Sequence, residues 1–108
     1  MLYKKDKGVI ILARGTGQVI IGPLRGIIEN VLLTPKDAAG GIVDYMIYDV
    51  IVLDGDKDKV FIKRNVVGEW CSPVAIPAGK SMDEYVTFVV DNASHNFNFD
   101  VVVLTKEK

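Results

Sequence analysis

The sequence has very few of the residues that build disulfides, metal clusters or catalytic pairs. It contains one cysteine, Cys71, and one histidine, His95, in 108 residues. A single cysteine excludes an internal disulfide and a cysteine-based metal cluster, and a single histidine excludes most zinc sites. Neither sign of charge is in excess, since 13 Lys and Arg stand against 14 Asp and Glu. This balance excludes a strongly basic nucleic-acid module, which needs clustered positive charge.

Long apolar runs are also missing. The apolar stretch from Gly8 to Ala13 ends at Arg14, whereas a secretory signal needs an apolar region of roughly 7–15 residues. No window reaches the roughly 18 apolar residues of a membrane-spanning helix. We therefore expect a soluble, unprocessed protein that needs no cofactor or metal and contacts neither membrane nor nucleic acid.

The apolar residues that are present are mostly β-branched. There are 16 valines and 11 isoleucines against 7 leucines, and Val and Ile favour pleated, half-buried surfaces over helices. Ten glycines and four prolines punctuate the chain at short intervals, as the turns of an all-β protein require. Seven or eight short strands at intervals of roughly 8–12 residues predict an antiparallel β-sandwich or jelly roll. We expect a single domain over residues 1–108.

The N-terminal third suggests two particular strand arrangements. Residues 9–13 and 18–22 are expected to be strands joined by a hairpin-like turn at 14–17, because that turn holds two glycines. Residues 26–34 are expected to alternate strictly between the two faces of a sheet, and Pro35 is expected to end that strand. One face of this strand would then carry Ile27, Glu29, Val31 and Leu33.

One stretch resembles the start of a calcium loop. Asp54, Asp56 and Asp58 stand at alternate positions, as in an EF-hand. That loop also needs Gly at its sixth position and Glu at its twelfth, where this chain has Lys59 and Asn65. We therefore interpret the stretch as an Asp-Gly turn with a solvated charge cluster that binds no metal.

Candidate catalytic residues are few. Ser94 adjoins His95 in an expected turn, and neighbours in sequence rarely point at each other, so spacing shows no nucleophile with its base. Cys71 beside Trp70 is typical of a small buried side chain. A sugar could stack on Trp70, but one Trp in a small sandwich is by default packed in the core. We therefore expect no catalytic residue and no enzyme.

Two expected strands, residues 45–53 and 97–104, carry apolar side chains on both faces. A sandwich strand with one solvated face should alternate cleanly between apolar and polar residues. Apolar residues on both faces indicate burial on both sides, either by loops of the same chain or by partner subunits. The second apolar face supplies the residues that we predict to form a protein interface: Ile47, Ile51, Val102 and Leu104.

Three phrases of the sequence carry a resemblance to a known group. They are Gly26-Ile27-Ile28 leading to Pro35, Tyr48-Asp49-Val50 before Asp54-Gly55-Asp56, and Val89-Val90-Asp91-Asn92-Ala93 followed by Val101-Val102-Val103-Leu104. Over about three-quarters of its length the chain resembles small virion proteins of tailed bacteriophages, the β-sandwich accessory proteins of the head. The charged stretch 57–64 and the Trp70-Cys71 segment depart from the glycine-rich linkers of that group.

The resemblance implies a non-enzymatic structural protein of the virion. Such a protein would decorate or stabilise the capsid, with the major capsid protein or another virion protein as its partner, either as a homo-oligomer or bound to the lattice. It would be made in the host cytoplasm without a signal peptide. A decoration protein needs a broad apolar or hydrogen-bonding surface for contact with its partner.

Two alternatives to the virion structural protein stay open. The first is a receptor- or carbohydrate-binding module of a phage tail or fibre, which needs an exposed aromatic cluster. The second is a small cellular enzyme or regulator, which needs a pocket with convergent polar groups. An electron micrograph of the assembly with which the protein copurifies would distinguish these possibilities better than any assay.

Overall fold

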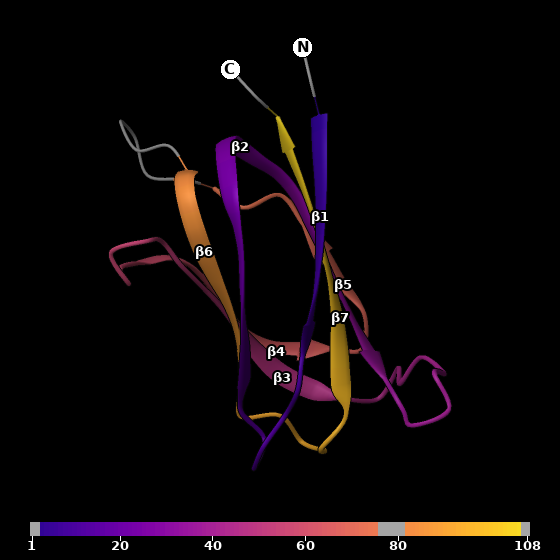
Figure 1. The fold of residues 1–108 in the computed structure, drawn as a ribbon. Coiled ribbons are helices and arrows are strands. Elements are labelled where there is room, and N and C mark those ends of the chain that lie inside the picture. Colours follow the sequence, from indigo (N-terminus) through magenta and orange to yellow (C-terminus); the bar gives the residue numbers. More distant parts are fainter. Residues whose placement is uncertain (1–2, 76–81, 107–108) are drawn as a thin grey trace.

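The computed structural model describes residues 3–75 and 82–106 (Figure 1). Within these residues the regular secondary structure is entirely β, which confirms the predicted all-β, sandwich-like class. No helix of the described chain is long and apolar enough to cross a membrane. The strands are β1 (Tyr3–Ile10), β2 (Gly17–Lys36), β3 (Ile47–Leu53), β4 (Lys59–Val67), β5 (Trp70–Ser72), β6 (Met82–Asp91) and β7 (Asn98–Lys106).

The strands form one curled antiparallel sheet in the order β1-β7-β2-β6-β3-β4, with β5 paired to β2. The long strand β2 joins the two halves, because residues 17–26 pair with β6 and residues 27–36 pair with β7. Between these segments the chain bends at the cis Gly22–Pro23 bond and at Gly26, whose φ is +84°. Figure 1 shows β2 rising beside β6, turning at the top and descending beside β7.

The core lies between the two halves of the curled sheet. Its largest fully buried side chains include Tyr48 on β3, Phe88 on β6 and Phe99 on β7. The Tyr48 and Phe99 rings meet edge to face with centroids 4.6 Å apart. The buried Tyr48 hydroxyl donates a hydrogen bond of 2.6 Å to the Gly68 carbonyl. Burial, with the nearby Glu69 carboxylate, raises the pKa of Tyr48 well above its usual value, so the phenol stays protonated.

The expected hairpin-like turn near the N-terminus is present, with an antiparallel bridge between Ala13 and Thr16, but the strands on either side of it do not form a hairpin. Residues 14–17 do form a tight turn, in which the Ala13 N–H donates to the Thr16 carbonyl at 2.9 Å. The flanking strands, however, pair with β7 and β6 and not with each other. The two strands instead approach each other closely at Gly8, where a Cβ would come within 2.9 Å of the Val19 side chain. Without a side chain at Gly8, β1 packs closely across the face of β2.

The expected strict alternation over residues 26–34 is also wrong. A register shift between Ile28 and Asn30 marks a β-bulge in β2, and a bulge inserts one extra residue on one strand. As a result Ile28 and Val31 both point into the core, with 1% and 0% exposure. Ile27, which was expected to share the face of Val31, is 42% exposed.

Candidate functional site

The four predicted interface residues lie on the outer surface of the curled sheet, in two separate regions. Val102 and Leu104 are on β7, whereas Ile47 and Ile51 are on β3, and β2 and β6 lie between those two strands. Ile47 is 45% exposed and the other three are half-buried. The structure therefore does not bring the four residues together, and the loops of the chain leave all of them partly accessible to solvent.

Val102 and Leu104 belong to a continuous surface formed by four strands. Residues paired across antiparallel strands share a face, and Val102 pairs with Lys7 of β1 and with Leu32 of β2. Leu32 pairs in turn with Cys71 of β5. We call this surface the β7 face, and it comprises Lys5, Lys7, Val9, Asn30, Leu32, Cys71, Val102 and Leu104.

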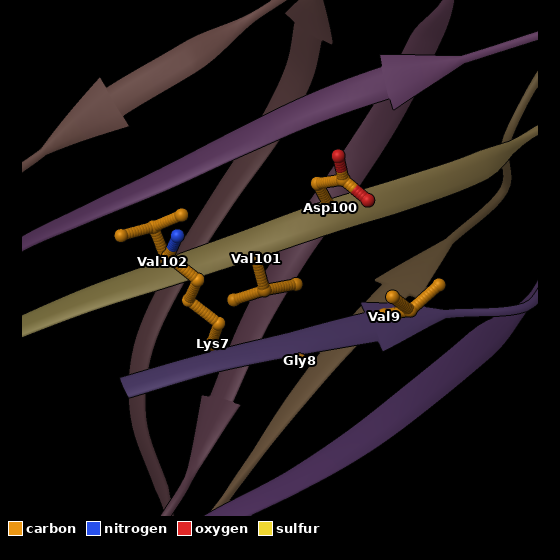
Figure 2. A pocket seen from close by; sticks show the side chains of 6 residues that line it. All are labelled: Lys7, Gly8, Val9, Asp100, Val101 and Val102. Carbon is orange, nitrogen blue, oxygen red and sulfur yellow. The ribbon is translucent and has the colours of Figure 1, made fainter. Parts of the chain in front are cut away.

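Two hollows lie side by side on the β7 face and share Val102. The first has a volume of about 330 Å³ between β1 and β7 and is lined by Lys7, Gly8, Val9, Asp100, Val101 and Val102 (Figure 2). The second has about 220 Å³ and is lined by Lys5, Asn30, Leu32, Cys71, Val102 and Leu104. The β7 face thus has an apolar centre with polar side chains around it.

The charges on and beside the β7 face are not balanced. At its periphery Lys106 lies 3.8 Å from the Glu29 carboxylate, and Lys36 lies 4.0 Å from that of Asp100. Lys5 and Lys7 are exposed on β1, and neither forms an ion pair or a side-chain hydrogen bond with any described residue. The β1 side of the face therefore presents two positive charges that no carboxylate of the described chain neutralises.

Cys71 does not have the burial that the sequence suggested. The thiol is exposed on β5, where its sulfur lies 3.3 Å from the Asn30 side-chain oxygen. Because successive side chains of a strand point to opposite faces, Trp70 is the residue of the pair that enters the core. Trp70 is 9% exposed and packs against Phe61 with ring centroids 5.5 Å apart. The prediction that Trp70 is a core residue is confirmed.

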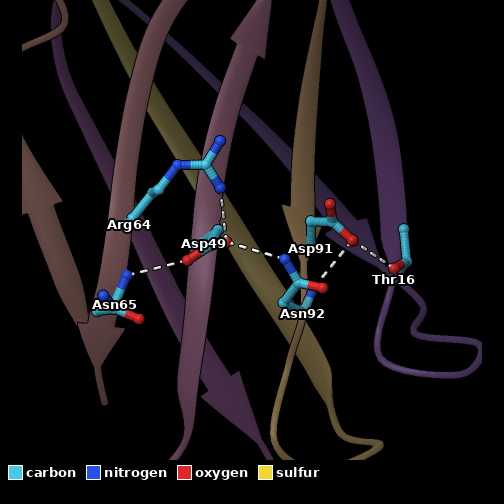
Figure 3. A network of polar contacts seen from close by, with 6 residues as sticks. All are labelled: Thr16, Asp49, Arg64, Asn65, Asp91 and Asn92. Atoms are coloured by element: carbon cyan, nitrogen blue, oxygen red, sulfur yellow. Dashed lines mark hydrogen bonds and ion pairs between the residues drawn. The ribbon is translucent and has the colours of Figure 1, made fainter.

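A polar network occupies the outer surface of β3, β4 and β6 (Figure 3). At its centre Asp49, which is only 6% exposed, accepts a hydrogen bond of 2.9 Å from the Asn65 backbone N–H. It also accepts bonds from the Asn92 side-chain amide at 3.0 Å and from Arg64 at 3.2 Å. The Asn65 and Asn92 hydrogen bonds, assisted by the Arg64 charge, outweigh burial and hold the pKa of Asp49 below its usual value.

Asp91 extends the polar network to the start of β2. It pairs with Asp49 across β6 and β3, and its carboxylate accepts a 2.7 Å hydrogen bond from the Thr16 hydroxyl. No spacing of residues in the sequence predicted this network. The one feature of the sequence that relates to the network is the residue type at two turns. Asn65 and Asn92 have φ values of +57° and +53°, and Asn is among the residues that tolerate this left-handed region.

An exposed aromatic cluster lies next to the polar network. The His95 ring stacks on Phe97 with centroids 5.9 Å apart, and it meets Tyr45 edge to face at 5.1 Å. Ser94 links this cluster to β3, because its hydroxyl accepts a 3.0 Å hydrogen bond from the Ile47 N–H. The cluster is the kind of feature that was expected of a carbohydrate-binding module.

The expectation that Ser94 and His95 would not point at each other is wrong. The Ser94 hydroxyl lies 2.8 Å from His95 Nδ1, because the bond from Ile47 fixes the serine side chain on that side. Because a hydroxyl can donate one hydrogen bond and accept two, Ser94 can hold the Ile47 N–H and the imidazole nitrogen at the same time. Among the described residues no carboxylate contacts this imidazole, so the third member of a catalytic triad is missing there.

The Asp54–Asp58 segment is a turn between β3 and β4, as predicted. The expected solvation of the cluster is wrong for Asp54, which is fully buried. One carboxylate oxygen of Asp54 accepts the backbone N–H groups of Asp56 and Asp58 at 2.9 and 3.0 Å, so this side chain organises the loop. The carboxylates of all three aspartates lie within 4.8 Å of one another.

Comparison of the chain with protein families, with characterised proteins and with solved structures gave no match. The function is therefore argued from the surfaces of the molecule. Those surfaces are the apolar and basic β7 face, the polar network around Asp49 and the aromatic cluster around His95.

Proposed function

We propose that this chain is a non-enzymatic structural protein that attaches to a larger protein assembly through its β7 face. The capsid of a tailed bacteriophage is the proposed assembly, and the major capsid protein or another virion protein is the proposed partner. The observation that carries the proposal is the combination of an apolar centre at Leu32, Val102 and Leu104 with the unpaired charges of Lys5 and Lys7.

The chemistry of the β7 face defines the partner surface. Its apolar centre supplies a driving force for association, because removing apolar area from water contributes roughly 25 cal/mol per Å². Lys5 and Lys7 favour a partner that places carboxylates opposite β1, since complementary charges steer encounter and fix the register of an interface. The proposed partner surface is therefore apolar at its centre and acidic on one side.

The two hollows of the β7 face fit a contact surface better than a catalytic pocket. Their linings combine aliphatic side chains with lysines, Asn30, Asp100 and Cys71, and the Cys71 sulfur contacts the Asn30 side-chain oxygen, which is not a base. Ser94 and His95, which do approach each other, lie outside both linings. This favours a binding protein over the small enzyme that the sequence left open.

The proposal is tested in two steps. The protein is first located on the particles, and its binding to them is then disrupted by a substitution that introduces one charge. Immunogold electron microscopy of purified phage particles, with antibody against this chain, is expected to label the head at regular positions. Particles lacking the protein are then incubated with purified wild type, Val102→Asp or the matched variant Ile51→Asp. Both substitutions place a carboxylate at a half-buried position of the outer surface, Val102 on β7 and Ile51 on β3.

We expect Val102→Asp to abolish binding to the particles and Ile51→Asp to leave it intact, because an unpaired charge buried in an interface is costly. Both variants are expected to fold, as judged by circular dichroism, since neither position is fully buried. Normal binding by a folded Val102→Asp variant would refute the assignment of the β7 face. Gold label confined to the tail, or absent from the particles, would refute the capsid proposal itself.

A further inference from the structure

The aromatic cluster and the polar network form one surface. Ser94 bonds to the Ile47 backbone, and Asn92, two residues earlier, bonds to Asp49, two residues after Ile47. Tyr45 precedes Ile47 by two residues, so Tyr45 and Asp49 are at most about 14 Å apart along the chain. Between them lies Ile47, which is 45% exposed. This surface therefore offers an aromatic ring, an apolar side chain and a polar network in succession.

The ring of Tyr45 is open on at least one face. Its contact with His95 has an interplanar angle of 81°, so either the edge of Tyr45 meets the His95 ring or the edge of His95 meets one face of Tyr45. In both arrangements the His95 contact leaves one Tyr45 face uncovered, and the side chain is 57% exposed. His95 in turn stacks on Phe97, so the three rings form one continuous cluster.

The planar side chains of Arg64 and Asn92 in the polar network keep hydrogen-bonding groups that their contacts with Asp49 do not use. Arg64 uses one guanidinium nitrogen on Asp49, and its side chain is 61% exposed. Asn92 uses its side-chain nitrogen on Asp49, so its carbonyl oxygen remains an acceptor. The two carboxylates and one guanidinium of the network in Figure 3 carry a formal charge of −1, which does not favour an anionic ligand.

We propose that this surface, from Tyr45 through Ile47 to the Asp49 network, is a binding site for neutral oligosaccharides. A sugar ring presents an apolar face of C–H groups, which suits stacking on Tyr45. Its hydroxyls both donate and accept, which matches Arg64 and Asn92. The site is separate from the β7 face, and this proposal does not depend on the proposed attachment to a capsid.

The proposal is tested by titrating the isotopically labelled full chain with four neutral disaccharides and following the backbone amide resonances. The probes are lactose, maltose, cellobiose and N,N′-diacetylchitobiose, with sialyllactose as an anionic probe. We expect at least one neutral probe to bind with a Kd on the order of 1 mM. The shifted amides are expected to be those of residues 45–49 and 91–95, with little change on β1 and β7.

Two variants make the assignment specific. Tyr45→Ala is expected to weaken binding of that probe by at least about tenfold, and Arg64→Ala by a similar factor. The matched control is Tyr85→Ala, because Tyr85 on β6 is also 57% exposed, and this variant is expected to bind as the wild type does. The dispersion of the amide spectrum shows whether each variant is folded.

Three results would overturn the proposal. They are the absence of shifts with all four neutral probes, shifts that map outside residues 45–49 and 91–95, and unchanged binding by a folded Tyr45→Ala variant. Tighter binding of sialyllactose than of lactose would overturn the assignment to neutral ligands. None of these results bears on the capsid experiment, which depends on Val102.

Discussion

Replacing Asp49 by Asn is the sharpest test of the polar network. The two carboxylate oxygens accept from three donors, with Asn65 on one oxygen and Arg64 and Asn92 on the other. An amide at this position must direct its NH₂ group at one of these sets of donors, whichever way it is turned. The substitution therefore changes almost no volume but places donor against donor and removes the negative charge beside Arg64.

The expected loss of stability is set by how well water replaces the broken bonds. A hydrogen bond to a charged group contributes about 1.5–3 kcal/mol, so three such bonds would give an upper limit of about 5–9 kcal/mol. Asn65, Arg64 and Asn92 are exposed, and their donors turn to water in the variant. We therefore expect Asp49→Asn to lower the free energy of unfolding by about 2–3 kcal/mol at pH 7, and Tm by about 8–15 °C.

The effect must also depend on pH. The pKa of Asp49 is lowered in the folded protein, whereas an Asp in the unfolded chain titrates near 3.9. The stabilisation is therefore fully present above the unfolded pKa and is lost as the pH falls through the lower, folded pKa. The Asn variant has no such group, so the difference in stability between wild type and variant should shrink as the pH falls below about 4.

Both the loss of unfolding free energy at pH 7 and its dependence on pH are measured by urea denaturation. The fluorescence of Trp70, the only tryptophan, follows unfolding. Trp70 is buried against Phe61, so unfolding changes its emission. The other carboxylates titrate in both proteins and largely cancel in the comparison. A loss below about 0.5 kcal/mol at pH 7, or a difference that stays constant from pH 7 to pH 3, would refute the role assigned to this network.

Three further substitutions test individual contacts. Tyr48→Phe removes the buried hydroxyl that donates a hydrogen bond to the Gly68 carbonyl. It should lower the free energy of unfolding by about 1 kcal/mol in urea denaturation, and an unchanged urea midpoint would contradict this. Gly68→Ala should cost about 2 kcal/mol in the same assay, because the φ of +69° disfavours a side chain and a Cβ would lie 2.8 Å from the Asp44 carbonyl. Cys71 should react with a thiol reagent in the native state, and Cys71→Ser should change stability by less than about 0.5 kcal/mol, whereas a protected thiol would contradict its exposure on β5.

The sequence predicts the strands with regular alternation well. A two-residue period puts Phe97, Phe99, Val101 and Val103 on the inward face of the last expected strand, and the last three are fully buried, whereas Phe97 precedes β7 and is half-buried. In β3 the same period puts Val50 and Val52 on one face, and both are fully buried. These strands lack Gly and Pro in their interiors, and a period of two residues alone determines which side chains face the core. The apolar residues on their outer faces were correctly identified for the same reason.

The same rule fails for β2, because its geometry depends on other strands. The bulge near Glu29 and the bend at Gly22–Pro23 let one strand pair with β6 in its first half and β7 in its second. Gly8 permits the close contact with Val19, but a glycine in a strand has several possible roles. The sequence marks these positions as unusual without showing which partner each segment will take.

The surface formed by the polar network and the aromatic cluster could not be predicted from the sequence, because its residues come from separate strands and turns. Asp49, Arg64 and Asn92 come from β3, β4 and the turn after β6, and no spacing along the chain relates them. The order β6-β3-β4 brings them together. Read singly, each residue is an ordinary polar residue of a strand or turn, and Tyr45 and His95 are fifty positions apart.

The edges of the curled sheet bear on the proposed association through the β7 face. In the described chain β1 and β4 stand at the two ends of the strand order, so each has one side without a strand partner. Lysines on edge strands discourage the addition of another strand, and β1 carries Lys4, Lys5 and Lys7. On β4, Lys59, Lys63 and Arg64 have the same sign of charge. Pairing β1 or β4 with an edge strand of a second copy would bring basic side chains near one another, which is destabilising where they stand directly opposite. Association through a face of the sheet avoids this repulsion, and in the proposed association through the β7 face Lys5 and Lys7 of β1 lie beside the apolar centre, where an acidic partner would make them favourable.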